Sequence, residues 1–249
     1  MGVAPSVWME QRRIESFDVD ISGRLRPQNL LAYLLNSAWN HANTTSYGFE
    51  KLSERNLMWV LIKIQLVINR QPKWGEQITI ETWGKRIERL YALRDFACIS
   101  ASGEKLISAT SSWMILDRTS GRPQRFDQTT DRFSWQPGRE EIETDLAKVQ
   151  ATSTGKEIAR FRVLFSDMDV NRHVNSAKYL QWMIDGHSQE HLEVKEPESI
   201  ELSFLSEAMQ NDEVAVFSEE SDDHELCTAR RTSDSKELCR ARFKWRTSR

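Results

Sequence analysis

The sequence predicts an α+β protein built from two similar halves, each an antiparallel sheet wrapped around one long helix. Two stretches with apolar residues at helical spacing, near residues 27–46 and 175–192, lie far apart in the chain. Each is followed by several short stretches of alternating or β-branched apolar residues, which are typical of strands. A polar segment rich in turn-forming residues separates the two series. The repeated order of elements therefore predicts two domains of one fold.

The first half begins with a strand over residues 8–21 and a helix over residues 27–46. Pro27 suits the first turn of this helix, and Gly48 suits its C-terminal cap. Ser102-Gly103 marks a hairpin between the last two strands of this half. Four strands are expected after the helix, over residues 57–68, 78–83, 90–100 and 106–116.

Beyond residue 117 the chain becomes polar, charged and interrupted by Gly and Pro. A loop of this length inside one compact domain is uncommon, which favours a role between domains. We therefore predict an N-terminal domain of residues 1–130, a connector of residues 131–156 with a short helix near 140–149, and a C-terminal domain of residues 157–249.

The second half repeats the order of the first. A strand over residues 157–165 leads into a polar loop, and a helix is expected over residues 175–192. Four further strands are expected over residues 198–205, 213–218, 225–232 and 238–246.

The two loops that precede the helices form an internal repeat in the sequence. Residues 20–25 align without gaps on residues 169–174, at an offset of 149 positions. Arg24 in the first copy stands where the second copy has His173. An Arg stays protonated near neutral pH and cannot act as a base, whereas an imidazole changes charge between about pH 5 and 8. The chemistry is therefore expected in the second half.

The second loop carries Asp169, Asn171 and His173 at alternate positions. In an extended segment these side chains would point to one side and line one wall of a pocket. Asn175 or Ser176 is the expected N-cap of the next helix, and its free N–H groups would suit a developing oxyanion. A carboxylate, an amide, an imidazole and an oxyanion site indicate acyl transfer to water. The same residue types also occur in turns and caps without catalysis.

This segment resembles the signature of the acyl-acyl-carrier-protein thioesterases, the plant-type family and its bacterial relatives. Their second domain carries the pattern S-D-x-D-x-N-x-H-V-N-N-x-K-Y-x-x-W, and Ser176 departs from it at the second of two adjacent Asn. The matching positions are Ser166, Asp167, Asp169, Asn171, His173, Val174, Asn175, Lys178, Tyr179 and Trp182. The resemblance implies a tandem (double) hotdog fold whose N-terminal domain mainly holds the acyl chain. It implies hydrolysis of fatty acyl-acyl-carrier-protein thioesters to free fatty acid and carrier protein.

The family also uses a glutamate after the catalytic helix, in a segment like L-E-Y-R-R-E-C. Residues 202–208 match this segment, which places Glu207 on the glutamate and Ala208 where plant members have Cys. A cysteine nucleophile is therefore absent from that position. The resemblance implies that Glu207 acts together with the Asp, Asn and His of the signature, without metal or organic cofactor. Which carboxylate serves as the base stays open.

Other functions are also compatible with the sequence. An acyl-CoA thioesterase would use the same residues on a different thioester, and a dehydratase-like or non-catalytic hotdog protein would bind acyl chains. The spacing of His187 and His191 fits H-x-x-E-H, a zinc-peptidase motif in which both His lie on one helix. The strand-like region after this motif offers no clear third ligand.

Composition and charge limit the partners. The net charge of −3 gives no overall basic field for nucleic acid. An acidic carrier protein would need a local basic patch, for which Lys85, Arg86 and Arg89 or the tail over residues 230–249 are candidates. No run of eighteen apolar residues predicts a membrane span.

Three cysteines without CxxC spacing fit a reducing compartment, so a cytoplasmic location is expected. The resemblance also allows a homodimer, because hotdog sheets often pair edge to edge.

Overall fold

The computed structural model describes residues 5–126, 135–143 and 147–248. The chain divides into two compact units. The first comprises residues 1–26, 30–64 and 69–146, and the second comprises residues 27–29, 65–68 and 147–249. None of the described helices is long and apolar enough to cross a membrane.

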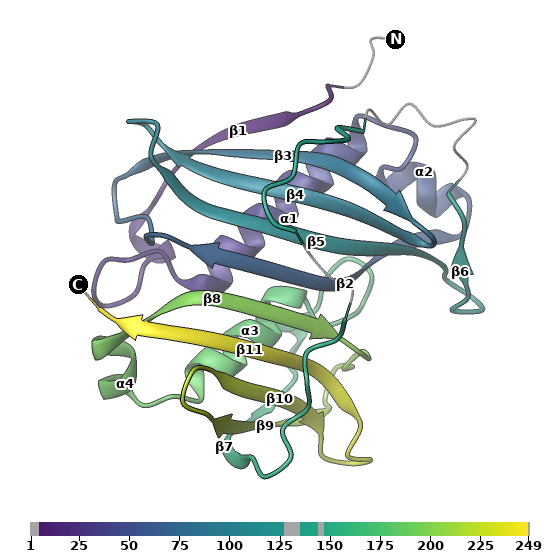
Figure 1. Ribbon diagram of the computed structural model, residues 1–249. Coiled ribbons are helices and arrows are strands. Elements are labelled where there is room, and N and C mark those ends of the chain that lie inside the picture. Colours follow the sequence, from purple (N-terminus) through teal and green to yellow (C-terminus); the bar gives the residue numbers. More distant parts are fainter. Residues whose placement is uncertain (1–4, 127–134, 144–146, 249) are drawn as a thin grey trace. The chain divides into compact units, whose positions relative to one another are not determined.

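The first unit is an antiparallel sheet with a long helix against one face (Figure 1). Its strands follow the order β1-β3-β4-β5-β2, and β6 pairs with β5. The elements that lie wholly or mostly in this unit are β1 (Trp8–Arg13), the 3-10 turn η1 (Ser16–Asp18), α1 (Pro27–Asn43), α2 (Phe49–Glu54), β2 (Leu57–Ile68), β3 (Gln77–Glu88), β4 (Tyr91–Ser100), β5 (Lys105–Asp117) and β6 (Pro123–Gln124).

Helix α1 buries the apolar face that its sequence predicts. Leu30, Leu31 and Leu34 are buried to within 1% of their surface, and each such side chain contributes about 1.5–3 kcal/mol to folding. The helix ends at Asn43, three residues before the predicted end, because the next two residues use their hydroxyls on the last carbonyls. Thr44 Oγ1 donates to the His41 oxygen at 2.7 Å, and Thr45 Oγ1 donates to the Ala42 oxygen at 2.6 Å.

Gly48 was predicted to cap the C-terminus of α1 but is the N-cap of the short helix α2. A Cβ atom at this position would lie 2.7 Å from Asn43 Oδ1 and 2.8 Å from its Cα. The close approach of the two helices, rather than a left-handed backbone, therefore requires glycine here.

The second unit repeats the arrangement, with strand order β8-β11-β10-β9-β7 and helix α3 against the sheet (Figure 1). All neighbouring pairs in this sheet are antiparallel. The elements are β7 (Lys156–Arg162), the 3-10 turn η2 (Phe165–Asp167), α3 (Ser176–Asp185), α4 (Gln189–Val194), β8 (Lys195–Phe204), β9 (Glu213–Glu220), β10 (Glu225–Arg231) and β11 (Glu237–Thr247).

The predicted helix over residues 175–192 is two helices. α3 ends at Asp185 because the ring of His187 bonds to the carbonyl oxygens of Met183 at 2.9 Å and Ile184 at 3.3 Å, which takes the place of further helical N–H donors. Ser188 then starts α4 by accepting a hydrogen bond from the His191 N–H at 3.2 Å. These two polar side chains interrupt a pattern that otherwise reads as one helix.

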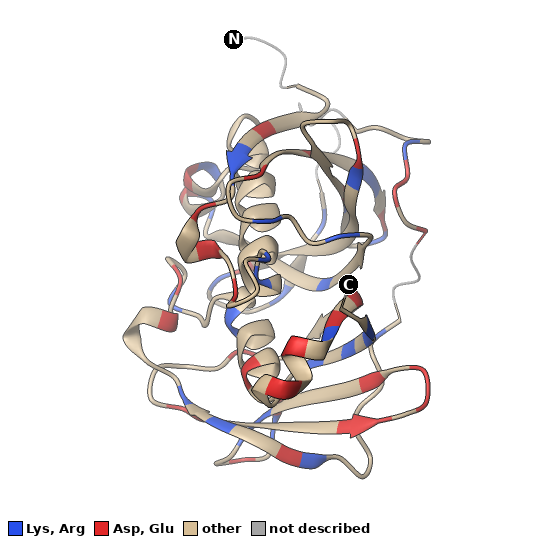
Figure 2. Cartoon of the chain, turned by 90° about the vertical axis from the view of Figure 1, so that its left-hand side faces the viewer, with Lys and Arg blue, Asp and Glu red and all other residues tan. Residues whose placement is uncertain are grey.

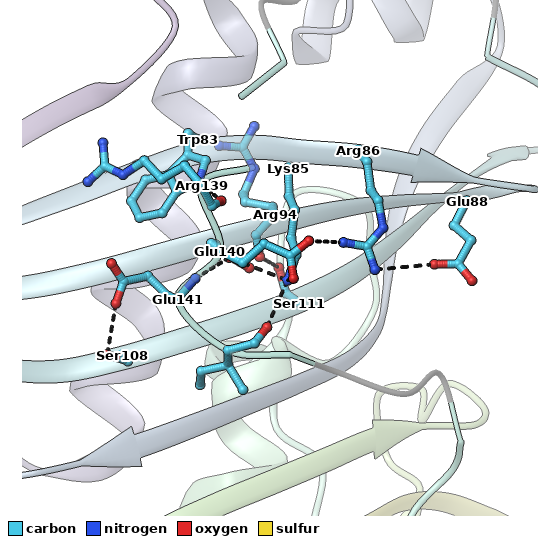
Figure 3. Close-up of polar contacts among 12 residues, drawn as sticks. Trp83, Lys85, Arg86, Glu88, Arg94, Ser108, Ser111, Arg139, Glu140 and Glu141 are labelled. Carbon is cyan, nitrogen blue, oxygen red and sulfur yellow. Dashed lines mark hydrogen bonds and ion pairs between the residues drawn. The ribbon is translucent and has the colours of Figure 1, made fainter. Parts of the chain in front are cut away.

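Part of the predicted connector packs on the first unit (Figure 3). Arg139 lies over the ring of Trp83 at 3.7 Å, and its carbonyl accepts the Trp83 indole N–H at 3.0 Å. Lys85 Nζ donates to the Ile142 oxygen at 2.7 Å and pairs with Glu140 at 3.2 Å. The domain boundaries at residues 130 and 156 stay predictions. Residues 140–143 and 147–149 are not helical, and the rest of the helix predicted near 140–149 lies outside the described residues.

Replacing Arg139 by Ala is expected to lower the free energy of unfolding by about 1 kcal/mol, a small value because its guanidinium is partly exposed. The variant loses the stacking on Trp83 and the ion pair with Glu81 at 2.5 Å. Urea denaturation of Arg139→Ala and of the exposed control Arg125→Ala measures the difference. An equal stability of the two variants would contradict the role of this contact.

Candidate active site

The loop before the helix has the same backbone in both units, as the repeat predicts. The carboxylate of Asp169 accepts the N–H groups of Asn171 at 2.8 Å and His173 at 3.2 Å. Asp20 Oδ1 in the first unit accepts the N–H groups two and four residues on, at 2.8 and 3.0 Å. A left-handed residue follows in both turns, Gly23 at φ 73° and Arg172 at φ 65°. The two loops are therefore one structural motif used twice.

This geometry corrects the expected extended segment. Asp169, Asn171 and His173 lie in a tight turn that a bridge between Met168 and Val174 closes. An Asp side chain that bonds to nearby backbone N–H groups favours such a turn over an extended strand. Asp169 thus anchors the turn through its oxygen, and His173 stands at the end of it.

A second anchor fastens the turn to helix α3. Asp167 is buried and pairs with Lys178 Nζ at 3.0 Å. Its other carboxylate oxygen accepts the Leu164 N–H at 2.8 Å, and its carbonyl accepts the Asn175 N–H at 2.8 Å. Asn175, one of the two residues predicted for the N-cap, is the N-cap and accepts the Ala177 N–H at 2.9 Å. The turn that carries His173 is therefore held from both ends.

The Asn175 N–H cannot serve the predicted oxyanion site while it donates to Asp167. The preceding amide differs between the two units. Leu25 N–H donates to the Pro72 oxygen at 2.8 Å, whereas its counterpart Val174 N–H makes no hydrogen bond within the described part of the chain. Val174 is therefore the candidate oxyanion donor that the geometry supports.

The structure brings Glu207 to His173. Glu207 Oε2 lies 3.1 Å from His173 Nε2, with the Glu side chain 47% and the His side chain 24% exposed. Glu207 follows β8, and His173 precedes α3, so the two residues are 34 positions apart in the chain. Asn171 lies in the same turn as His173 and is half-buried. A carboxylate and an imidazole in contact at a half-exposed position can share a proton with a water molecule.

The loop after β8 also has a counterpart in the first unit. The backbone N–H groups of Leu205 and Ser206 donate to the Leu238 carbonyl oxygen. The backbone N–H groups of Asn69 and Arg70 donate to the Leu106 carbonyl oxygen in the same way. The offset of 136 positions then places Gln71 on Glu207.

The first unit has therefore lost both reactive side chains. Gln71 stands in place of the carboxylate and donates to the Leu25 oxygen at 2.8 Å. Arg24 stands in place of the imidazole and pairs with Asp20 at 3.6 Å. An amide and a guanidinium cannot accept a proton, so this half keeps the loop without the chemistry.

Two further residues hold the backbone around Glu207. Tyr179 Oη accepts the Ala208 N–H at 3.0 Å, and Arg231 Nη2 donates to the Glu207 oxygen at 3.2 Å. Tyr179 matches the signature, but sequence reasoning assigned it no role. Arg231 lies at the end of β10, and no sequence pattern links it to the site.

Comparison with known proteins matches both halves of the chain to one family. Residues 5–131 match the acyl-ACP thioesterase N-terminal domain, and residues 150–247 match the acyl-ACP thioesterase C-terminal domain. The chain belongs to the acyl-ACP thioesterase family. The predicted family and the tandem hotdog fold are confirmed.

Curated members of this family are similar along most of the chain. The chloroplastic acyl-[acyl-carrier-protein] hydrolase FATB2 of Cuphea viscosissima is 26% identical over 214 residues, which cover 81% of this chain and 52% of the relative. The chloroplastic oleoyl-acyl carrier protein thioesterase 2 of Arabidopsis thaliana is 25% identical over 222 residues, covering 82% of this chain and 60% of the relative. This chain thus spans little more than half the length of the curated relatives it matches.

A solved structure supports the fold over the full chain. The acyl-ACP thioesterase from Bacteroides thetaiotaomicron has a TM-score of 0.88 and 26% sequence identity, and the match covers 99% of this chain and 100% of that one.

The zinc-peptidase motif has a different explanation in this acyl-ACP thioesterase family member. His187 and His191 do not share one helix, because the break before Gln189 separates them. Their ligand atoms and a Glu225 oxygen lie within 4.8 Å of one another. However, Glu225 already binds His187 Nε2 at 2.9 Å and the Trp245 indole N–H at 2.7 Å. The contacts describe a buried ion pair.

The two predicted basic patches are largely neutralised. Lys85 is buried between Asp95 and Glu140, and Arg86 pairs with Glu140 and Glu88 (Figure 3). The tail shows the same pairing of its arginines with glutamates. The pairs are Arg230 and Arg240 with Glu237, Arg242 with Glu201, and Arg246 with Glu196. Figure 2 accordingly shows basic and acidic positions interspersed along the chain.

Proposed function

We propose that this protein hydrolyses fatty acyl thioesters of acyl carrier protein (ACP) to free fatty acid and carrier protein. The observation that carries the proposal is the contact of His173 with Glu207 at 3.1 Å in the second unit. The first unit, with the same loop, has neither group. Chemistry that needs a proton acceptor can therefore occur in the second unit and not in the equivalent place in the first.

In the proposed reaction Glu207 takes a proton from water, and the oxygen of that water attacks the thioester carbon. The carbon–sulfur bond then breaks, and the thiolate leaves with the phosphopantetheine arm and takes up a proton. A direct attack by Glu207 would instead give an anhydride that water opens. Either route ends in the same products, and neither requires a metal or an organic cofactor.

The remaining groups would orient and stabilise the reacting atoms. His173 would hold Glu207 and the water, and Asn171 would assist from the same turn. Asp169 would keep the turn in shape through its two N–H contacts. Val174 N–H would donate to the carbonyl oxygen as negative charge develops on it, a contribution that typically increases with exclusion of water.

The partner in this proposal is ACP carrying a fatty acyl chain, in the cytoplasm. The names of the curated relatives support the carrier protein as substrate. The three cysteines are free and buried, which fits a reducing compartment. A homodimer stays a prediction of the family resemblance. An acyl-CoA thioesterase is the second candidate, because the residues around Glu207 act on the acyl carbon and not on the carrier.

Steady-state hydrolysis of a panel of acyl-ACP thioesters and the matching acyl-CoA thioesters tests the proposal. We expect turnover of the ACP forms and a loss of about 10²-fold or more in His173→Ala. Arg24→Ala, the equivalent change in the first unit, is the control and should retain turnover. Preference for CoA forms would move the protein to the second candidate. No turnover of any thioester, with acyl chains still bound, would leave an acyl-binding protein.

A further inference from the structure

The position of Glu207 in the chain does not by itself fix the orientation of its carboxylate. Its side chain is 47% exposed and lies in a loop after β8, yet its carboxylate must stay within hydrogen-bond distance of His173. A half-exposed Glu in a loop has many rotamers, and a displacement of about 1 Å can reduce a rate by about 10²-fold. Other contacts must therefore limit this freedom.

Two contacts hold the backbone on either side of the peptide bond that follows Glu207. Arg231 donates to the carbonyl of that bond at 3.2 Å, and the buried hydroxyl of Tyr179 accepts its N–H, from Ala208, at 3.0 Å. Both polar groups of one peptide unit are thus bound by side chains from two other elements, α3 and β10. The orientation of this peptide unit sets the direction in which Glu207 leaves the backbone.

Arg231 is itself held in place. Its Nε lies 3.5 Å from Asp212 and 3.6 Å from Asp234, and its side chain is largely buried. Tyr179 lies on α3 and contacts Trp182 and Phe204 edge to face. The side chains of Tyr179 and Arg231 are therefore held in place by residues other than Glu207.

The first unit provides an internal comparison, because it has the same loops without the Glu–His pair. The starts of α1 and α3 align Leu30 with Tyr179. Pro72, which has no N–H, aligns with Ala208. Ser100 aligns with Arg231, because Ser100 pairs with Ile78 of β3 as Arg231 pairs with the equivalent Val214 of β9. All three parts of the support are missing where the reactive pair is missing.

We propose that Tyr179 and Arg231 are positioning residues that clamp the Glu207 peptide unit and so keep its carboxylate facing His173. The expected effect of these two residues on turnover rests on the proposed function. The geometric part of the clamp, the placement of Glu207 beside His173, does not depend on which thioester is hydrolysed.

A double-mutant cycle tests the clamp. Tyr179→Phe keeps the ring and removes the hydroxyl, and we expect it to lower kcat by about tenfold with KM within about twofold. In a Glu207→Gln background the same change should cause no further loss, because its effect passes through the carboxylate. An equal loss of kcat in both backgrounds would overturn the proposal. The matched control is Tyr33→Phe, which removes a hydroxyl on α1 that is hydrogen-bonded to Asp18 of η1.

Arg231→Lys tests the other half of the clamp. Lysine retains the charge between Asp212 and Asp234 but lacks the fork that reaches the Glu207 carbonyl. A loss of kcat similar to that of Tyr179→Phe would support the contact. A kcat equal to that of wild type in Arg231→Lys would show that Arg231 does not position Glu207.

The 15N spectrum of the His173 ring separates failure of the clamp from failure of the proposed function. Glu207→Gln should change the ring resonances, and Tyr179→Phe should change them in the same direction. Resonances that stay at the wild-type positions in Tyr179→Phe would overturn the clamp even if no thioester proves to be a substrate. A shift without any thioesterase activity would retain the clamp and reject the proposed function.

Discussion

Glu207→Gln is expected to lower kcat/KM for acyl-ACP hydrolysis by about 10²- to 10⁴-fold, the usual contribution of a positioned acid–base group. The amide has nearly the same size as the carboxylate and can still hydrogen-bond to His173. It can neither take a proton from water nor attack the thioester. The loss should therefore be in kcat, with the fold and the binding of substrate retained.

The control for this variant is Glu213→Gln, which makes the same change at a side chain of similar exposure, 50% against 47%. Glu213 pairs with Arg160 and lies outside the site. Turnover that survives Glu207→Gln would transfer the role of base to Asp169, the carboxylate that anchors the turn before α3. Equal losses in both variants would indicate a general effect of charge.

Glu225→Gln is expected to lower the free energy of unfolding by about 3–5 kcal/mol, because it leaves a buried charged partner without its counter-charge. The side chains of His187 and Glu225 are only 6% and 3% exposed. Both ring nitrogens of His187 face acceptors, Glu225 on one side and the Met183 carbonyl on the other. This arrangement is satisfied when the imidazole is protonated.

The same pair predicts how stability depends on pH. Burial would raise the pKa of Glu225, but the hydrogen bond and charge of His187, with Ser218 and Trp245, lower it to about 2. Burial would lower the pKa of His187, but Glu225 and the helix carbonyls raise it above the ordinary 6.5. The Glu225 contribution is present above pH 4.5 and is lost as the pH falls towards 2. The His187 contribution is present below pH 6.5 and is lost as the pH rises through the raised pKa.

Urea denaturation of wild type and Glu225→Gln over a range of pH measures this contribution. The difference in unfolding free energy should be largest between about pH 4.5 and 6.5 and should shrink on both sides. Leu192→Ala, on the neighbouring helix α4, is a control whose effect should not follow this pH profile. A difference below about 1 kcal/mol at every pH would contradict the buried ion pair.

Much of the strand and helix order could be read from the sequence, because alternation and helical spacing are local. The predicted strand over residues 57–68 coincides with β2, and the helix starting at Pro27 begins where Pro favours it. Helix ends were less predictable. The ends of α1 and α3 depend on side chains such as Thr44 and His187 that bond to the helix carbonyls, and their rotamers follow from packing.

By itself, the sequence determined that the chain holds two copies of one unit and that only the second keeps an ionisable His173. It also contained the signature from which Glu207 could be aligned. Only the tertiary structure decided the shape of the turn around Asp169 and the contact of His173 with Glu207. It also decided that Gln71 is the first-unit counterpart of Glu207 and that Arg231 reaches its carbonyl. These contacts and correspondences involve residues far apart in the chain. Local sequence periodicity does not predict them, because they depend on how the strands pair and on which loops come together.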